Sequence, residues 1–264
     1  MGSSSSKKIG GMIISFDKPY YYTGDEVNGY LNLNLFDKAP LSKIEIDLSV
    51  IEYNKFLDKE GDFNPHNHMK HLSRDFRHHH SKNGVVREGR KTLLKNYGYI
   101  NTNNLSKGQY VFPFYFSIPM NLPGSFEYYD KDNVAYIMYV ITARMVIPNY
   151  PENDLIHDTI LMVRQSPQYF EYPNILTTTK NLTSICFDKG TTTFQISYAK
   201  HFFSPDEVLQ VICDIDNTNC SLNARSIKLE LFQRIYVKDN QMHSAFITRK
   251  LAEQRYDGFY VRLS

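Results

Sequence analysis

The chain of 264 residues has no tryptophan, only three cysteines, no secretory leader and no long apolar run. Cys186, Cys213 and Cys220 are an odd number without a C-x-x-C pair, and no apolar h-region opens the chain. These absences predict a reducing, intracellular setting with free and mostly buried thiols. No run approaches about 18 consecutive apolar residues, so the sequence predicts no membrane span, and membrane contact would be peripheral.

Common motifs of catalysis and nucleotide binding are absent as well, since no P-loop, G-x-S-x-G or H-E-x-x-H sequence occurs. Residues 211–218 resemble the first motif of haloacid-dehalogenase-type phosphatases, in which Asp214 would attack phosphorus and Asp216 would act as acid and base beside Mg²⁺. That chemistry requires a parallel sheet with a helix after the strand, yet residues 227–231 alternate as in another strand. We therefore predict a turn between two strands here, a protein that is not an enzyme, and no cofactor or metal.

What the chain does contain is an internal repeat of whole-domain length. Residues 14–18 and 21–27 (ISFDK and YYTGDEV) return about 181 residues later as residues 196–200 and 202–208 (ISYAK and FFSPDEV). Each copy has a strand, an aromatic pair, a turn with Gly or Pro before Asp-Glu, and a second strand. This period is too long for a solenoid repeat, so it predicts two tandem β domains.

Apolar and polar residues alternate along most of the chain, as in half-exposed antiparallel strands. The predicted strands are 27–35, 44–50, 110–116, 135–147, 155–163, 193–198, 208–216 and 227–237, with two weaker ones near Phe246 and Phe259. No segment keeps a helical period over three turns. The 20 Tyr and 17 Phe suit half-buried pleated surfaces. The sequence thus predicts an all-β chain of two tandem immunoglobulin-like antiparallel β-sandwiches.

Several short motifs follow one another in a specific order and spacing. They are GMIIS at 11–15, YTGDEVNG at 22–29, LSKGQYVFPF at 105–114, IP at 118–119, LPGSF at 122–126 and AYIMYV at 135–140. Together they resemble the N-terminal domain of arrestins, most of all the arrestin-domain-containing proteins, or alpha-arrestins. FDKG at 187–190, FSPDEV at 203–208 and IDN at 215–217 resemble the start of the arrestin C-terminal domain. The resemblance covers nearly the whole chain.

The predicted domain boundaries follow from this resemblance and from the composition. We expect a flexible leader over 1–8, an arrestin-like N-terminal sandwich over 9–166 with a polar, basic insert at about 54–95, and a linker over 167–180. An arrestin-like C-terminal sandwich is predicted over 181–264. About 90 residues follow the linker, fewer than a full second sandwich needs. The second sandwich is therefore predicted to be partial, apparently truncated.

The resemblance implies a non-enzymatic adaptor or scaffold that binds cytoplasmic parts of membrane proteins in trafficking, endocytosis or signalling. It also implies recruitment of ubiquitin ligases or coat proteins, although neither the family's Pro-Pro-x-Tyr motif nor a clathrin-binding box occurs in this sequence. The alternative is a retromer-type coat subunit, which shares the double sandwich. The LPGSF and GDEV motifs favour the adaptor. The expected location is cytoplasmic, with peripheral contact at the plasma membrane or endosomes, and no nucleic-acid partner is predicted.

The N-terminus carries a separate signal. Residues 1–6 fit the M-G-x-x-x-[ST] pattern for N-myristoylation of Gly2; the alternatives are a flexible polar leader or an expression-vector remnant. One acyl chain binds a bilayer only marginally, with about 10⁴ M⁻¹, so stable residence needs a second contact. The basic residues predicted to supply that contact are Lys7, Lys8, Arg74, Arg77, Lys82, Arg87, Arg90 and Lys91.

Most of those cations lie between residues 55 and 95, where ten Lys or Arg stand against five Asp or Glu. The same segment holds six histidines: His66, His68, His71, His78, His79 and His80. Their spacings admit a zinc site, and a lipid contact strengthened by acid is a second possibility. Because Asn, Lys, Arg and Gly surround them and no element fixes their geometry, we predict a solvated insert between two strands.

Overall fold

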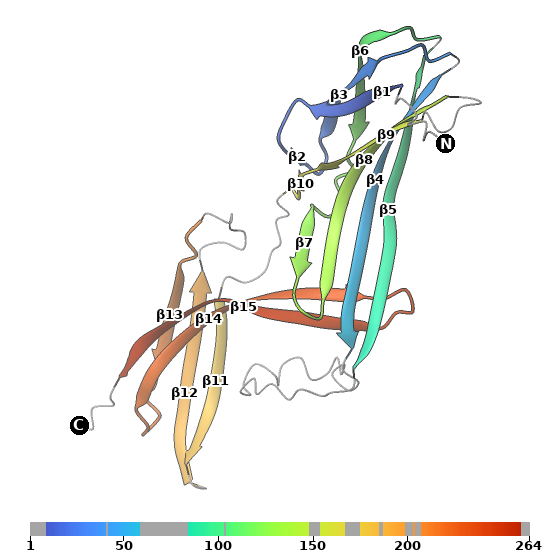
Figure 1. Ribbon diagram of the computed structural model, residues 1–264. Helices are drawn as coiled ribbons and strands as arrows, with labels where there is room; N and C mark the ends of the chain where they lie inside the picture. The colour runs from blue at the N-terminus through green and yellow to red at the C-terminus, as the bar shows by residue number, and fades with distance from the viewer. Residues whose placement is uncertain are drawn as a thin grey trace. The chain divides into compact units, whose positions relative to one another are not determined.

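The computed structural model describes residues 9–40, 42–58, 84–102, 104–147, 154–166, 175–184, 187–198, 203 and 207–259. Every regular element within these ranges is a strand, which confirms the all-β prediction (Figure 1). The strands are β1 (Gly10–Phe16), β2 (Tyr21–Tyr22), β3 (Glu26–Leu35), β4 (Lys43–Asp58), β5 (Val85–Asn101), β6 (Gly108–Ser117), β7 (Phe126–Tyr129), β8 (Val134–Val146), β9 (Leu155–Leu161), β10 (Val163–Arg164), β11 (Ile175–Ser184), β12 (Phe187–Tyr198), β13 (Val211–Asp216), β14 (Ala224–Lys238) and β15 (Ser244–Phe259).

The chain divides into two compact units. Unit 1 comprises Met1–Ser166 and Ile235–Ile247, and unit 2 comprises Pro167–Arg234 and Thr248–Ser264. The tip of the β14–β15 hairpin therefore belongs to unit 1. Residues 235–247, which were predicted to lie in the second sandwich, are the main departure from the expected domain boundaries.

Unit 1 is a sandwich of two antiparallel sheets. One sheet has the order β1-β3-β6, and the other has the order β5-β4-β8-β7, with β9 also pairing with β8 (Figure 1). β7 pairs with residues 134–137 of β8, and β9 pairs with residues 139–145. The free side of β8 thus pairs with β9 along its upper half and with β7 along its lower half, and the residues of β4 that pair with β8 divide in the same way.

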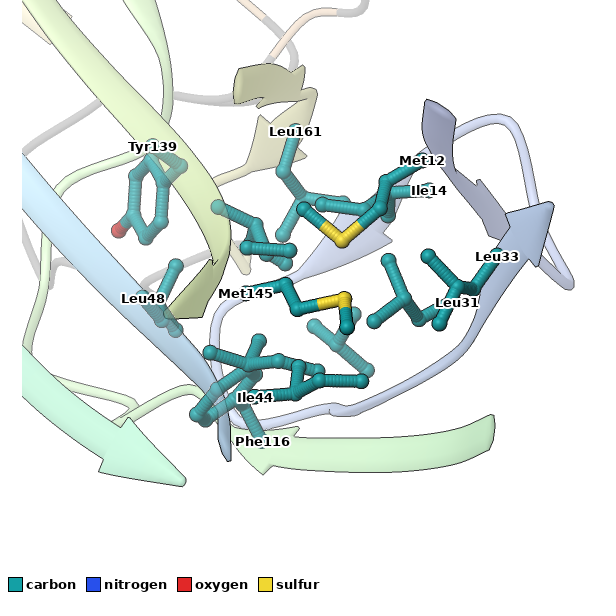
Figure 2. Close-up of a cluster of buried hydrophobic side chains, with 14 of the residues drawn as sticks. Met12, Ile14, Leu31, Leu33, Ile44, Leu48, Phe116, Tyr139, Met145 and Leu161 are labelled. Carbon is teal, nitrogen blue, oxygen red and sulfur yellow. The ribbon is translucent and has the colours of Figure 1, made fainter. Parts of the chain in front are cut away.

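The upper half of this sheet packs against β1, β3 and β6. Figure 2 shows the contact, with Met12, Leu31 and Leu33 facing Ile44, Leu48 and Met145. Leu31, Ile44 and Leu48 have no exposed surface, and each such side chain contributes roughly 1.5–3 kcal/mol by its burial. The Tyr139 hydroxyl donates a hydrogen bond to the Pro123 carbonyl at 2.6 Å, and burial raises the pKa of Tyr139 to about 12.

The lower half of the sheet packs against the hairpin tip instead. Phe56 on β4, Tyr128 on β7 and Ala135 on β8 form a second buried cluster with three residues of the tip, Ile235, Val237 and Ile247. Phe56 has no exposed surface and Val237 only 3%. A segment about 70 residues beyond the rest of unit 1 thus supplies the facing layer for half of its large sheet.

The basic insert predicted at about 54–95 is wrong at both ends. β4 continues to Asp58 and β5 begins at Val85, and the two strands pair without interruption over these residues except for one bulge at Val50/Ile51. The cations misled the prediction because Arg90, Lys91 and Lys95 are all exposed, although the strand that carries them is paired with β4. Residues 59–83, including all six histidines, lie outside the described residues.

The internal repeat is confirmed in the strand pairing. Ile14 lies opposite Leu31 and Phe16 opposite Gly29, while Ile196 lies opposite Cys213 and Tyr198 opposite Val211. The two antiparallel pairs therefore have the same register at the repeat offset. In unit 2, β11, β12 and β13 form one sheet in that order, and β14 pairs with β15.

The predicted linker and the last predicted strands also differ from the structure. β11 begins at Ile175, inside the segment 167–180, because its pairing with β12 orders residues whose sequence, rich in threonine, gives little alternation. The two weak strands near Phe246 and Phe259 are parts of one strand, β15. β13 begins at Val211 rather than at residue 208.

Candidate interaction surfaces

The outer side of the sheet β1-β3-β6 carries no charged side chain apart from Glu26, at the first position of β3. Its other members, here called the uncharged face, are Gly11, Ile13, Ser15, Asn28, Tyr30, Asn32, Asn34, Gln109, Val111, Pro113 and Tyr115. They share one side because every second residue of these strands points into the core. Neighbours across the strands make the surface continuous, since Ile13 lies opposite Asn32, which lies opposite Val111.

The large apolar and aromatic residues of the uncharged face are well exposed. Ile13, Tyr30, Val111 and Tyr115 have between 48% and 69% of their surface exposed. Tyrosine supplies rigid contact area, while asparagine and serine supply adaptable hydrogen bonds, a composition that is typical of protein-binding surfaces. The absence of charge removes the desolvation cost that burying charged groups would impose on a complex. The uncharged face is therefore suited to bind a protein segment.

A second candidate region lies where the hairpin tip contacts β4 and β5. Asn54 Nδ2 donates to the Lys238 carbonyl at 2.9 Å, and the Arg90 backbone N–H donates to Asn240 Oδ1 at 3.1 Å. Gly89 is required here, because a Cβ atom at this position would lie 2.5 Å from the Lys238 carbonyl oxygen. The backbone of the tip therefore approaches β5 as closely as a glycine allows.

Next to these bonds lies a cluster of charged side chains. Arg87 Nε contacts Asp58 Oδ2 at 2.5 Å, and Arg87 Nη1 lies 3.7 Å from Asp239 Oδ2 and 3.0 Å from His243 Nδ1. Asp239 is buried and accepts hydrogen bonds from the backbone N–H groups of Gln241 and His243, both at 2.8 Å. Its Oδ2 also lies 2.9 Å from His243 Nδ1.

The pKa of Asp239 reflects two opposing effects. Burial alone would raise it, but the hydrogen bond from His243 and the two backbone N–H groups favour the carboxylate and hold the pKa below its ordinary value. Asp239 thus stays ionised beside Arg87. The cluster fixes the turn of the hairpin on β5 through charge as well as through apolar contact.

The structure describes only some of the residues that were predicted to contact a membrane. Gly2, Lys7, Lys8, Arg74, Arg77 and Lys82 lie outside the described residues. Arg87 is on β5 and forms ion pairs with Asp58 and Asp239, and its membrane contact stays a prediction. Arg90 and Lys91 are exposed and border, with Lys238, a cavity of about 300 Å³ at the hairpin tip.

The region that resembled a phosphatase motif is a turn, as predicted. β13 is antiparallel to β12, and Asp216 accepts hydrogen bonds from the Thr218 backbone N–H at 3.0 Å and its hydroxyl at 2.6 Å. The chain then enters β14. Within the described residues, no group of three or more His, Cys, Asp or Glu is arranged to hold a metal ion.

Unit 2 contains a large groove between its two sheets. Its volume is about 740 Å³, and its apolar lining consists of Leu182, Phe194, Ile196, Val211, Cys213, Ile215, Leu222, Ile227, Leu229 and Tyr256. The sequence predicted strands for most of these residues, although not for Leu182 or Leu222, and it did not predict an open groove, because alternation shows which residues share a face and not what covers that face. The residues Asp239 and His243 were missed for a similar reason, since no local signal links them to Arg87.

Sequence matches to known proteins agree with the β-sandwich found in unit 1. Residues 12–167 match the family described as Arrestin (or S-antigen), N-terminal domain. The chain is 27% identical over 165 residues to arrestin domain-containing protein A of Dictyostelium discoideum, an alignment that covers 61% of this chain and 27% of that relative. No helix of the described residues is long and apolar enough to cross a membrane. With a matched region that extends over more than half its length and a sandwich of the expected topology, the chain belongs to the arrestin family.

Proposed function

We propose that this protein is a non-enzymatic, arrestin-like adaptor that binds cytoplasmic segments of membrane proteins in trafficking, endocytosis or signalling. The observation that carries the proposal is the uncharged face on the family-matched sandwich, with exposed Ile13, Tyr30, Val111 and Tyr115. Its lack of charge and its tyrosine and asparagine content suit a neutral peptide segment better than an anionic lipid surface. Recruitment of ubiquitin ligases or coat proteins belongs to the same proposal.

The proposal is tested by charging the face. A Val111→Glu variant and an Ile160→Glu control would be purified with their partners under mild detergent from the cells that express the protein, followed by quantitative mass spectrometry. The two residues are matched, with 60% and 64% exposure on strands of unit 1. We expect integral membrane proteins to be lost with Val111→Glu and kept with Ile160→Glu. Equal recovery of integral membrane proteins with both variants would show that the uncharged face does not bind these proteins. Recovery of a stoichiometric set of retromer subunits would instead make the protein a coat component.

We further propose peripheral membrane residence through N-myristoylation of Gly2, at the plasma membrane or endosomes. The support is the N-terminal pattern together with Lys7, Lys8, Arg90 and Lys91 as basic contacts. A Gly2→Ala variant is expected to move from membrane to soluble fractions. A Lys7→Ala, Lys8→Ala variant that keeps Gly2 should be only partly displaced, and unchanged fractionation of Gly2→Ala would remove the lipid from the proposal.

A further inference from the structure

Unit 2 differs from unit 1 in how little of it is buried. Of the residues that the structure describes in unit 2, only Thr192 and Cys220 are buried, whereas unit 1 has two clusters of buried side chains. The groove between the sheets leaves Phe194, Ile196 and Ile215 half-exposed. A volume of about 740 Å³ lies within the range of roughly 300–1,000 Å³ typical of sites that bind a ligand.

The groove is bordered by a strand, β13, one edge of which pairs with no other strand among the described residues. β13 pairs with β12 along its whole length, from Tyr198↔Val211 to Thr193↔Asp216, and it is the last strand of its sheet. Natural proteins shield such edges with Pro, Lys, a bulge or a covering element. β13, with the sequence VICDID, carries no Pro or Lys, and its pairing with β12 has no bulge. Its outer N–H and C=O groups are therefore placed to pair with another strand.

The two sides of β13 differ in chemistry. Val211, Cys213 and Ile215 line the groove, whereas the residues between them, Ile212, Asp214 and Asp216, are exposed on the opposite side. A strand that paired with β13 would place alternate side chains in the groove and the others beside these carboxylates.

The carboxylates are not matched by cations on the neighbouring strand. Asp214 lies opposite Gln195 on β12, and Asp216 lies opposite Thr193. The lysine that borders the groove on β14, Lys228, forms ion pairs with Glu230 at 2.7 Å and Glu253 at 3.3 Å. The charge beside the free edge is thus negative, and it complements basic side chains on the outer side of an added strand.

We propose that the groove of unit 2 binds an extended peptide segment of a partner protein, which pairs with β13 as an additional strand. Its side chains at every second position are apolar and fill the groove between Phe194 and Ile227, and those between them are lysine or arginine beside Asp214 and Asp216. About six residues suffice, since a strand of that length spans roughly 20 Å. Main-chain hydrogen bonds supply affinity and the alternation supplies specificity. This site is separate from the uncharged face and does not depend on the function proposed for that face.

Cys213 offers a direct readout, because its thiol is exposed and its side chain lines the groove. The probe is a synthetic peptide of alternating valine and lysine, and the control peptide has the same composition in two blocks. Alkylation of Cys213 in the full chain by iodoacetamide is followed by mass spectrometry of the peptide that contains it. We expect the alternating peptide to slow alkylation at least tenfold at saturation and the block peptide to leave the rate unchanged.

A pair of variants tests the charge requirement. Asp214→Lys should weaken binding of the alternating peptide by roughly tenfold, measured by fluorescence anisotropy, because repulsion replaces attraction. Asp158→Lys, an equal charge reversal at an exposed position of β9, should bind as the unmodified chain does. If Asp214→Lys fails to fold, the alkylation experiment on the unmodified chain still decides the matter.

Three results would overturn the proposal. The alternating peptide could fail to slow alkylation of Cys213, or the block peptide could slow it equally, which would mean that apolar contact alone suffices. Protection of Cys213 that rises with protein concentration in the absence of peptide would show that a second copy of the chain occupies the groove.

Discussion

Replacing Ile235 by alanine should loosen the lower half of the sandwich in unit 1, although this residue lies far beyond the region matched to the arrestin N-terminal domain. Ile235 is 9% exposed and packs in the cluster that contains Phe56, Tyr128 and Ala135. The substitution removes three carbon groups at about 0.8 kcal/mol each and leaves a cavity, so a loss of about 3 kcal/mol is expected. Leu231→Ala, at a 43% exposed position of the same strand, is the control and should cost less than about 0.5 kcal/mol.

Hydrogen exchange measured by mass spectrometry locates the effect. A loss of about 3 kcal/mol corresponds to exchange roughly 100-fold faster in the amides that open with the cluster. We expect this acceleration in residues 54–58 of β4 and 126–129 of β7, and much less in residues 44–48, which pack against the other sheet. Unchanged exchange in residues 54–58 would refute the assignment of the hairpin tip to unit 1. An equal acceleration confined to β11 and β12 would refute it as well.

Three further predictions concern single groups. The pKa of Asp239 in the folded protein lies below its value in the unfolded chain. Its stabilising effect is therefore present above about pH 3.9 and is lost as the pH falls through the folded pKa. Asp239→Asn should abolish this acid-dependent step, measured as hydrogen exchange of the hairpin tip. Gly190→Ala should destabilise unit 2 by about 1–3 kcal/mol in urea unfolding, because the φ of Gly190 is 97° and a Cβ atom there would lie 1.8 Å from a backbone oxygen. Gly11→Ala is the control and should be neutral, because a Cβ atom at residue 11 would have no neighbour within 4 Å. Tyr21 and Tyr139, whose pKa values burial raises to about 12, should remain protonated at pH 11 in an ultraviolet titration, and a Tyr139→Phe variant should lose one late-titrating group.

The alternation of side chains made much of the fold predictable. Strands such as β3 and β6 were predicted because Val27, Leu31 and Leu33 recur at every second residue, and a buried face requires this spacing. The repeat predicted more than two domains, since it also implied equal strand pairing, and the register of β12 with β13 matches that of β1 with β3. These features were accessible because each depends on residues close together in the sequence.

The features that sequence reasoning missed depend on distant partners. Ile235, Val237 and Ile247 alternate as in any strand, and nothing near them indicates that they cover Phe56 about 180 residues earlier. β5 was not predicted because its many basic residues are typical of a solvent-exposed loop. One of them, Arg87, instead forms ion pairs with Asp58 and Asp239. The uncharged face was present in the strand pattern, but its importance became visible only when the pairing of β1, β3 and β6 joined Ile13, Asn32 and Val111 into one surface.

The placement of the hairpin tip in unit 1 has a consequence for biosynthesis. When Ser166 leaves the ribosome, the sheet that carries Phe56 and Tyr128 still lacks its cover, because Ile235–Ile247 has not yet been made. At about 5–20 residues per second, the missing 80 or so residues take roughly 4–16 s to appear. During that interval the nascent chain presents an apolar surface, so we expect chaperones to bind it there, and the N-terminal sandwich matures only after residues 235–247 have been made.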